Sequence, residues 1–442
     1  MAIKFVQSRL SWVLQGQSST AAAVQTLLAR VLILAVNLAT GIITARTLGA
    51  TGRGEQAAMI LWSMFLANTV TLGLPSAVIY NFKAHPQRKS ELFAAALLLG
   101  TGLGFVASAI GIIWIPLWLS QYSPDVVRAA QWFMLNAPIA LVQLLILAAL
   151  EAMGDFTASN RLRLLIPLIT LVALISLAVA DAITPLTSSL AYTLNGLPIF
   201  FWTLTRLWRL LRPQWQGITS AAQQLVHYGL RSYGVDLLGA LSLQLDQVLV
   251  VSFLDPASMG TYVVALSLSR MLNVFQMAIA AVLFPRAAAR PMSEVIALTG
   301  QAARLTTALT FTVGLAIIAL GPFLLELLYG AEFVQAARVL YILVIEAVIS
   351  GAALVLAQSF MALGNPGVVT VLQGAGLALS VPLMIWLIPI FGLVGAGLAL
   401  LASTVVRLLF TLSCYPLLLK VPLPALLITK QDLIFLRQKL LN

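Results

Sequence analysis

Long apolar stretches recur along the chain at intervals that fit membrane-spanning helices. About 20 apolar residues in a helix cross the hydrocarbon core of a bilayer. Twelve such stretches can be distinguished, at 23–45, 56–80, 93–119, 128–152, 162–181, 186–208, 232–254, 260–284, 304–328, 338–362, 367–389 and 392–418. Most connections are short and contain turn residues, as in HPQRKS, YSPD, MGDF and LGNPG. The pattern predicts an all-α membrane protein with twelve spans.

The composition agrees with a protein that lies in a membrane. Hydrophobic residues make up 61% of the chain and charged residues only 9%, whereas soluble proteins carry about 25% charged residues. In a soluble domain the net charge of +11 would indicate a nucleic-acid partner. In a membrane protein it reflects the Lys and Arg that gather in cytoplasmic loops. We therefore expect membrane lipids, and no nucleic acid, as partners.

The distribution of basic residues predicts the topology. With the N-terminus placed inside, 18 Lys and Arg residues fall in inner segments and 4 in outer loops. The richer side is the cytoplasmic one, so both termini are predicted to be cytoplasmic. The prediction comprises an inner N-terminal segment, a six-helix lobe, an inner linker, a second six-helix lobe and an inner tail. Their bounds are 1–22, 23–213, 214–231, 232–419 and 420–442.

The two predicted lobes share a weak sequence repeat. At a shift of 206 residues, TLGATGRGEQ (47–56) falls on FLDPASMGTY (253–262), and Gly54 falls on Gly260. LEAMGDF (150–156) matches FMALGNP (360–366) at a shift of 210. Two repeats of six spans have the same orientation in the membrane. Transporters built this way bind substrate between the repeats, which rock against each other.

Ionisable residues inside predicted spans are the first candidates for function, because each costs about 2.5–3.5 kcal/mol on insertion scales. Arg30 and Asp236 are 206 residues apart, so they are repeat equivalents of opposite sign. If their helices face each other across the cleft, this pair closes an inner gate. The alternative is that each residue pairs within its own lobe or extends to the interface.

Further charges lie in the second lobe. Asp246 and Arg270 fall at similar predicted depths in neighbouring helices. They form either a structural ion pair or a site in which Asp246 binds a coupling proton. Glu346 lies in the middle of the tenth span and is either a proton-relay group or an interhelical hydrogen-bonding group. Arg407 in the last span is expected to contact lipid headgroups or a neighbouring helix.

The glycine-rich stretch ARTLGATGRGEQ (45–56) is best explained as a tight outer turn. It lacks the Gly-Lys-Ser/Thr ending of a phosphate-binding loop, and no predicted strand precedes it. Its repeat partner contains no arginine and one glycine. The sequence shows neither a metal-ligand cluster nor a nucleophile–base set, because Cys414 is the single cysteine and the two histidines lie in separate loops. We expect no enzyme and no cofactor.

Three segments carry a resemblance to a known family. These are ARTLGATGRGEQAAMI, LGLPSAVIYNFKAHP and DQVLVVSFLDPASMGTYVVALSLSRMLNVFQMAIAAVLFPRAA. Together they resemble the bacterial polysaccharide flippases of the multidrug/oligosaccharidyl-lipid/polysaccharide exporter superfamily. The resemblance implies a V-shaped protein of two six-helix bundles around a central cavity. It also implies alternating access in the bacterial inner membrane and translocation of undecaprenyl-pyrophosphate-linked oligosaccharide.

The resemblance also suggests a cavity lined by amides and a few cations. The candidate lining residues are Arg30, Asn37, Asn136, Gln244, Arg270 and Asn273. Asp236, Asp246 and Glu346, together with Arg30, are the candidates for gating or ion coupling. H⁺ or Na⁺ is the expected coupling ion. Polysaccharide polymerase and glycosyltransferases are the expected protein partners of a monomeric flippase.

Three other functions fit the same sequence. A lipid II or related envelope-lipid flippase is one, although such proteins usually carry extra helices beyond the twelfth. A cation-coupled multidrug exporter would use the same fold with dominant acidic sites. A non-transporting membrane scaffold for polysaccharide synthesis belongs to another class, and mutations in its cavity would leave export intact.

Overall fold

The structure is a computed structural model that describes residues 19–287 and 290–425. Regular secondary structure in these residues is helical. The long helices are α2 (Ser19–Thr69), α3 (Leu74–Ala84), α4 (Lys89–Trp118), α5 (Pro124–Phe133), α6 (Ala137–Ala152), α7 (Phe156–Val179), α8 (Pro185–Leu194), α9 (Leu197–Leu211), α10 (Ile218–Phe253), α11 (Pro256–Ser269), α12 (Asn273–Ala287), α13 (Met292–Tyr329), α14 (Ala337–Ala362) and α15 (Pro366–Cys414). Short helical turns adjoin them at η1 (Pro86–Arg88), η2 (Met134–Asn136), η3 (Arg270–Leu272), η4 (Ala331–Ala336) and η5 (Tyr415–Leu419).

The predicted all-α membrane class is confirmed. Among the described residues, nine helical segments are long and apolar enough to cross a membrane. Two of them, Val31–Thr69 and Pro366–Leu419, contain 39 and 54 residues, and each includes two of the predicted spans. The predicted span 186–208 is missing from the nine because it is divided between α8 and α9, which have 10 and 15 residues.

Each of the two longest segments contains one glycine with a left-handed backbone. Gly49 has φ 67° and Gly392 has φ 57°, values that glycine adopts without steric cost. A Cβ atom built on Gly395 would lie 2.1 Å from the carbonyl oxygen of Leu387. In a straight helix, residues this far apart in sequence are separated by about 12 Å. The chain therefore reverses direction at Gly392, between the predicted spans 367–389 and 392–418.

Short polar side chains begin several helices where the sequence predicts turns. The Asp155 carboxylate accepts a hydrogen bond from the Ala158 amide at 3.0 Å, and Asp255 accepts one from the Ser258 amide at 2.9 Å. Ser123 does the same at the start of α5. These side chains satisfy amides that a helix start leaves unpaired. The turns predicted at YSPD and MGDF are confirmed as helix starts, and the repeat segment FLDPASMGTY contains another at Asp255.

The prediction of one continuous helix at 56–80 is wrong. α2 ends at Thr69 and α3 begins at Leu74. Between them Leu72 and Gly73 have φ of 47° and 72°, and Pro75, in the first turn of α3, has no amide hydrogen to donate to the preceding turn. This interruption brings the backbone of residues 69–73 close to α10, as described below.

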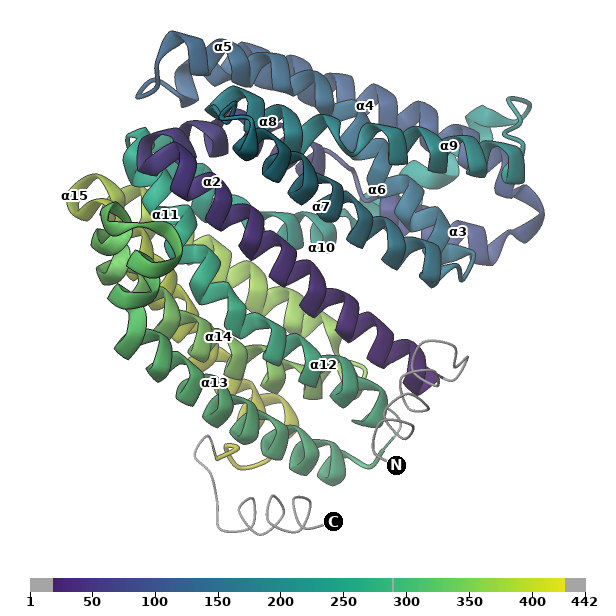
Figure 1. The fold of residues 1–442 in the computed structure, drawn as a ribbon. Helices are drawn as coiled ribbons and strands as arrows, with labels where there is room; N and C mark the ends of the chain where they lie inside the picture. Colours follow the sequence, from purple (N-terminus) through teal and green to yellow (C-terminus); the bar gives the residue numbers. More distant parts are fainter. Residues whose placement is uncertain (1–18, 288–289, 426–442) are drawn as a thin grey trace, which may run out of the picture.

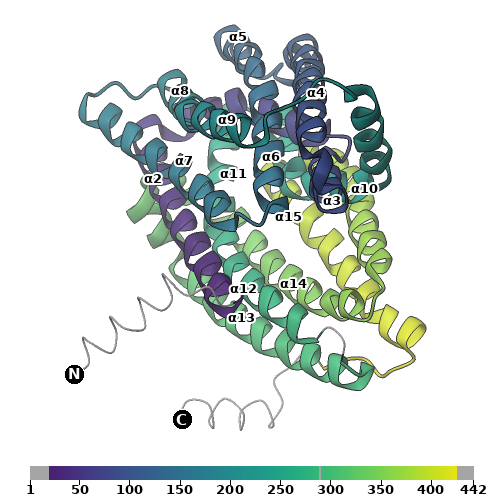
Figure 2. The ribbon, with the colours of Figure 1, turned by 90° about the vertical axis from the view of Figure 1, so that its right-hand side faces the viewer.

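Two helix bundles make up the molecule. Figure 1 shows α3 to α9 as an N-terminal bundle and α11 to α15 as a C-terminal bundle, with α2 and α10 lying between them. α2 contacts α7 and α11, and α10 contacts both α4 and α15, so each of these two helices joins the bundles. Figure 2, turned by 90°, shows the same separation of the two bundles.

The two ends of the molecule differ, and we name them by their residues. The glycine end is where α2 turns at Gly49. The linker end carries residues 212–217, which join α9 to α10. The linker is shorter than the predicted 214–231, because α10 begins at Ile218. Asp236 therefore lies near the middle of α10 and not close to its start. The predicted N-terminal segment and tail fall largely outside the described residues.

Candidate functional site

The C-terminal bundle contains an ion pair between α10 and η3 whose carboxylate is buried and whose guanidinium is 37% exposed. Arg270 Nη2 lies 3.3 Å from Asp246 Oδ2, and the Asp246 side chain is only 6% exposed. The Tyr262 hydroxyl of α11 donates to the same carboxylate oxygen at 3.0 Å, and Arg270 also donates to the Leu243 carbonyl at 3.0 Å. The expected proximity of Asp246 and Arg270 is therefore observed. A pair with a buried carboxylate is stable only when its remaining hydrogen bonds are satisfied.

A second charged pair of residues lies beside the first, on α14 and α15. Glu346 accepts a hydrogen bond from the Thr404 hydroxyl at 2.8 Å. Arg407 donates to the Ser350 hydroxyl at 2.8 Å, so it points into the bundle and away from lipid headgroups. Together with Asp246, these side chains line one polar cavity of about 120 Å³. α10, α14 and α15 thus enclose a cavity that contains two carboxylates and a guanidinium.

Two polar atoms of this cluster are buried without a hydrogen-bond partner among the described residues. They are Asp246 Oδ1 and Arg407 Nε. A buried polar group without a hydrogen bond is costly. A cavity of this size has room for water, because one water needs about 10–15 Å³ of such space. Water in the cavity would connect the carboxylate and the guanidinium, so the cluster is built for a hydrated ionic site.

Asp236 pairs across the molecule with the N-terminal bundle. Its Oδ1 accepts a hydrogen bond from the Ser76 hydroxyl of α3 at 2.9 Å, and its Oδ2 is buried without a partner among the described residues. Arg30 lies in α2, but its side chain is outside what the structure describes. The Arg30–Asp236 gate accordingly stays a prediction.

The polar seam between α3 and the first half of α10 extends well beyond Asp236. The Tyr233 hydroxyl donates to the Thr69 carbonyl at 2.5 Å. The Tyr80 and Tyr228 rings stack with centroids 4.2 Å apart. A Cβ atom built on Gly73 would lie 2.2 Å from the Gly229 carbonyl oxygen, so the two backbones touch. The first half of α10 is therefore fastened to the N-terminal bundle.

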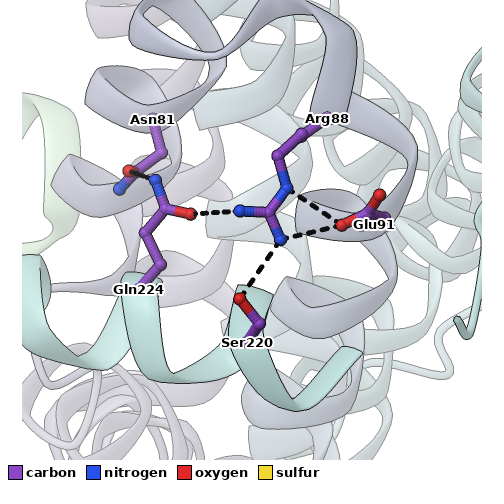
Figure 3. A network of polar contacts seen from close by, with 5 residues as sticks. All are labelled: Asn81, Arg88, Glu91, Ser220 and Gln224. Atoms are coloured by element: carbon purple, nitrogen blue, oxygen red, sulfur yellow. Dashed lines mark hydrogen bonds and ion pairs between the residues drawn. The ribbon is translucent and has the colours of Figure 1, made fainter. Parts of the chain in front are cut away.

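The seam ends in a polar network at the linker end (Figure 3). Gln224 donates to Asn81 at 2.9 Å and accepts from Arg88 at 3.0 Å. Arg88 also donates to Glu91 at 2.8 Å and to Ser220 at 3.4 Å. Both partners on α10 are uncharged, whereas the ion pair of Arg88 lies within the N-terminal bundle. The network can thus separate from α10 without leaving a charge unpaired.

The glycine end is closed by backbone contact between α2 and α11. A Cβ atom on Gly54 would lie 1.7 Å from the Pro256 carbonyl oxygen, and one on Gly260 would lie 1.9 Å from the Ala50 carbonyl oxygen. The contact is reciprocal: the shift of 206 residues that relates Gly54 to Gly260 also relates Ala50 to Pro256. The glycines of the repeat allow two helices to touch, in addition to forming a turn.

Two charged residues secure the same end. Arg46 Nε donates to the Leu328 carbonyl at 2.9 Å, and its guanidinium also donates to the Leu327 carbonyl. These carbonyls belong to the last turn of α13, where helix carbonyls lack partners. In return, Glu332 of η4 accepts a hydrogen bond from the Ala50 amide at 3.0 Å. The outer turn predicted from the sequence therefore docks on the C-terminal bundle.

The other predicted lining residues are dispersed. Asn37 is exposed on α2, and Gln244 is half-buried on α10, with its Oε1 buried and unpartnered. Asn136 lines a cavity of about 340 Å³ inside the N-terminal bundle. Asn273 lines a cavity of about 250 Å³ in the C-terminal bundle that also contains Arg407. The structure brings Asn273 near the charge cluster and separates it from Asn136.

Several residues of the site escape sequence reasoning. Ser76, Tyr262, Ser350 and Thr404 are ordinary residues of apolar helices and become partners only through tertiary packing. Arg407 carried the one usable signal, since a cation in the middle of a span usually faces the protein interior.

These features define a class of protein: a helical membrane transporter in which two bundles meet at two ends and one bundle encloses buried charges. The chain belongs to the polysaccharide biosynthesis protein family, whose model matches residues 43–338. This membership places the chain in a transporter family and not among enzymes. The resemblance expected from the sequence is confirmed.

Known proteins are similar to this chain to different extents. A probable low-salt glycan biosynthesis flippase of Haloferax volcanii is 23% identical over 190 residues, which cover 42% of this chain and 40% of that protein. A lipid II flippase in an inward closed conformation superposes with a TM-score of 0.75 at 12% identity, over 93% of this chain and 89% of that one. An inward-facing multidrug resistance transporter gives 0.67 at 15% identity, over 93% and 98%. The structural matches show the shared fold.

Proposed function

We propose that the protein is a flippase that moves undecaprenyl-pyrophosphate-linked oligosaccharide across the cytoplasmic membrane of a bacterium. The observation that carries this proposal is family membership, with the polysaccharide biosynthesis model matching residues 43–338. A relative named as a glycan biosynthesis flippase supports it. The cargo serves the synthesis of a surface polysaccharide, and the polymerase and glycosyltransferases of that synthesis are the proposed partners of a monomeric transporter.

The physical problem of this cargo is the transfer of a charged, hydroxyl-rich headgroup through hydrocarbon. Each polar group that loses water without a replacement partner costs several kcal/mol, on the order of 2–7 for an amide or hydroxyl. In the proposed mechanism, amides and cations replace that water while the polyprenyl tail stays in lipid. Asn37 and Gln244 on the two joining helices, with Arg30 and Arg270, are the proposed headgroup contacts. Asn136 and Asn273 lie in the bundle interiors and are proposed as secondary contacts.

In the proposed topology the chain crosses the membrane twelve times. α2 and α15 each supply two crossings that meet at Gly49 and Gly392, and α8 with α9 supplies one. The glycine end faces outward and the linker end faces the cytoplasm, together with both termini. The excess of Lys and Arg in the predicted inner segments supports this orientation.

Alternating access then requires the two ends to open in turn. Opening outward separates Gly54 from Gly260 and releases Arg46 from α13. Opening inward separates α10 from α3 and α4 at the linker end. Asp236 lies within this inner seam, bonded to Ser76, and Arg30 is its proposed second partner while the inner gate is closed. Asp246 and Glu346 are the proposed groups that couple the cycle to an ion gradient, of H⁺ or Na⁺.

The test is deletion of the gene in its source organism, followed by analysis of lipid-linked intermediates. We expect oligosaccharide on undecaprenyl pyrophosphate to accumulate on the cytoplasmic leaflet and surface polysaccharide to disappear. A plasmid copy should restore both. A normal lipid pool with normal surface polysaccharide would disprove the proposal. Rescue of cells depleted of their lipid II flippase would identify the alternative cargo, and export that survives Asp246→Asn and Glu346→Gln would favour a scaffold.

A further inference from the structure

The charge cluster of the C-terminal bundle is balanced by the protein itself. Asp246 is paired with Arg270 at 3.3 Å. Glu346 shares its cavity with Arg407, and these two side chains interact electrostatically. With both carboxylates ionised, two negative charges face two guanidinium groups. Guanidinium stays protonated at any physiological pH, so the positive charges are permanent.

This balance bears on which ion the cavity accepts. An alkali cation must exchange its hydration shell for a set of oxygen ligands. Here it would have to share Asp246 with the Arg270 guanidinium, and it would enter a cavity that already holds the positive charge of Arg407. The guanidinium of Arg407 also donates a hydrogen bond to the Ser350 hydroxyl, one of the oxygen atoms that line the cavity. A proton needs no coordination sphere, because it forms a covalent bond with a single carboxylate oxygen.

The cavity is also arranged for proton movement. Asp246 Oδ1 and Arg407 Nε are buried and have no partner in the part of the chain that the structure describes, and both residues line the cavity with Glu346. Water that satisfies these two atoms joins the carboxylates through hydrogen bonds. The groups that act on Glu346 are Thr404 and Arg407 from α15, Asp246 from α10 and Arg270 from η3. Tyr262 from α11 interacts with both carboxylates.

We propose that Arg407 is the residue that makes this site select protons over alkali cations, because its permanent positive charge lies in the same cavity of about 120 Å³ as Glu346 and Asp246. The inference rests on the proposed ion coupling at Asp246 and Glu346. A second consequence concerns the neighbouring cavity of about 250 Å³, which Arg407 also lines. Its cationic side chain stands between the two cavities and opposes the passage of Na⁺ from one to the other.

The test measures ion binding without any cargo. The full-length protein in detergent is melted in NaCl, KCl or choline chloride at equal ionic strength and pH. We expect the wild type to show the same Tm in all three salts. Arg407→Gln removes the charge. The Tm of this variant should be about 2 °C or more higher in NaCl than in KCl or choline chloride. Adding Glu346→Gln to this variant should abolish the rise.

Matched variants control for the loss of an arginine. Arg338→Gln removes an exposed arginine and should give no response to Na⁺, and Arg407→Lys keeps the charge and should also give none. A wild-type protein stabilised specifically by Na⁺ would overturn the proposal, as would an Arg407→Gln protein that folds and ignores Na⁺. If Arg407→Gln does not fold, Arg407→Met replaces it in the same comparison, and the wild-type result still decides whether Na⁺ binds.

This result is separable from the identity of the cargo. A deletion strain with normal lipid-linked intermediates would remove the proposed oligosaccharide substrate and leave the salt dependence of Tm unaffected. Conversely, Na⁺-specific stabilisation of the wild type would refute proton selection while the flippase proposal stands.

Discussion

The glycine end and the linker end hold the two bundles together by different means. At the glycine end, helix backbones touch: Cβ atoms at Gly54 and Gly260 would meet carbonyl oxygens at 1.7 and 1.9 Å. At the linker end the contacts are made by side chains, as in the bond of 2.9 Å between Gln224 and Asn81, and backbone contact occurs only further along the seam, at Gly73 and Gly229. Backbone contact is sterically all-or-none, whereas a side-chain network loses stability one bond at a time. The glycine end therefore tolerates no added side-chain atom, whereas the linker network can lose single hydrogen bonds and stay closed.

The largest effect is expected from Gly54→Ala. The new methyl group would overlap the Pro256 carbonyl, and overpacking of this kind costs about 1–3 kcal/mol. Export of surface polysaccharide should be lost in a complementation assay, because the glycine end cannot close around the added methyl group. The matched control is Gly41→Ala in the same helix, where a Cβ meets nothing within 4 Å. If both variants export equally well, closure of the glycine end does not depend on this contact.

A covalent bridge across the linker end should have the next largest effect. Asn81→Cys and Gln224→Cys are combined in a Cys414→Ser background, which removes the single native cysteine. A short thiol-specific crosslinker should join them, because their native side chains are hydrogen-bonded. The crosslinker is a cleavable reagent. Export should stop when the bridge forms and return when it is cleaved. Full export by the crosslinked protein would show that the seam never opens, and each single cysteine variant is the control.

Removing one charged contact at the glycine end should have an intermediate effect. Glu332→Ala loses the acceptor for the Ala50 amide, which resembles the loss of a helix cap and costs about 0.5–2 kcal/mol. Glu332→Gln keeps an acceptor oxygen and should lose less. Thermal unfolding in detergent measures both. Equal stability of the two variants would contradict a role for this hydrogen bond.

The smallest effects belong to the outer members of the linker network. Ser220→Ala removes a bond of 3.4 Å and should change stability by no more than a few tenths of a kcal/mol. Arg88→Ala also breaks the half-exposed pair with Glu91, and such pairs are worth about 0–1 kcal/mol. Export should stay within about two-fold of wild type in both variants. A loss as large as that of Gly54→Ala would remove the distinction between the two ends.

Features that depend on local chemistry were open to prediction from the sequence. The apolar stretches, the helix starts at Asp155 and Asp255 and the depth match of Asp246 with Arg270 all follow from composition and spacing. The shift of 206 residues also related Gly54 to Gly260, although it suggested a turn and not a crossing. The contact itself needs the relative placement of α2 and α11, which no local pattern encodes.

Features that depend on the partner of a residue could not be predicted. Asp236 was matched with Arg30 through the repeat, but its observed partner is Ser76, a small residue with no distinguishing pattern. The interruption between α2 and α3 was marked by Gly73 and Pro75, but the high hydropathy of residues 56–80 favoured one continuous span. Hydropathy measures transfer to the membrane and is insensitive to where a helix breaks. Arg407 was underestimated because its partners, Ser350 and the Glu346 cavity, lie on another helix.

The reciprocal contact at the glycine end has the form of a two-fold dimer interface within one chain. In such an interface the same patch serves on both sides, so residue 54 meets residue 256 as residue 260 meets residue 50. Elsewhere, equivalent positions of the two halves differ in charge, as residues 30 and 236 do: one is arginine and the other aspartate. At the crossing the two halves constrain each other, since neither glycine can be exchanged while the other helix stays in place.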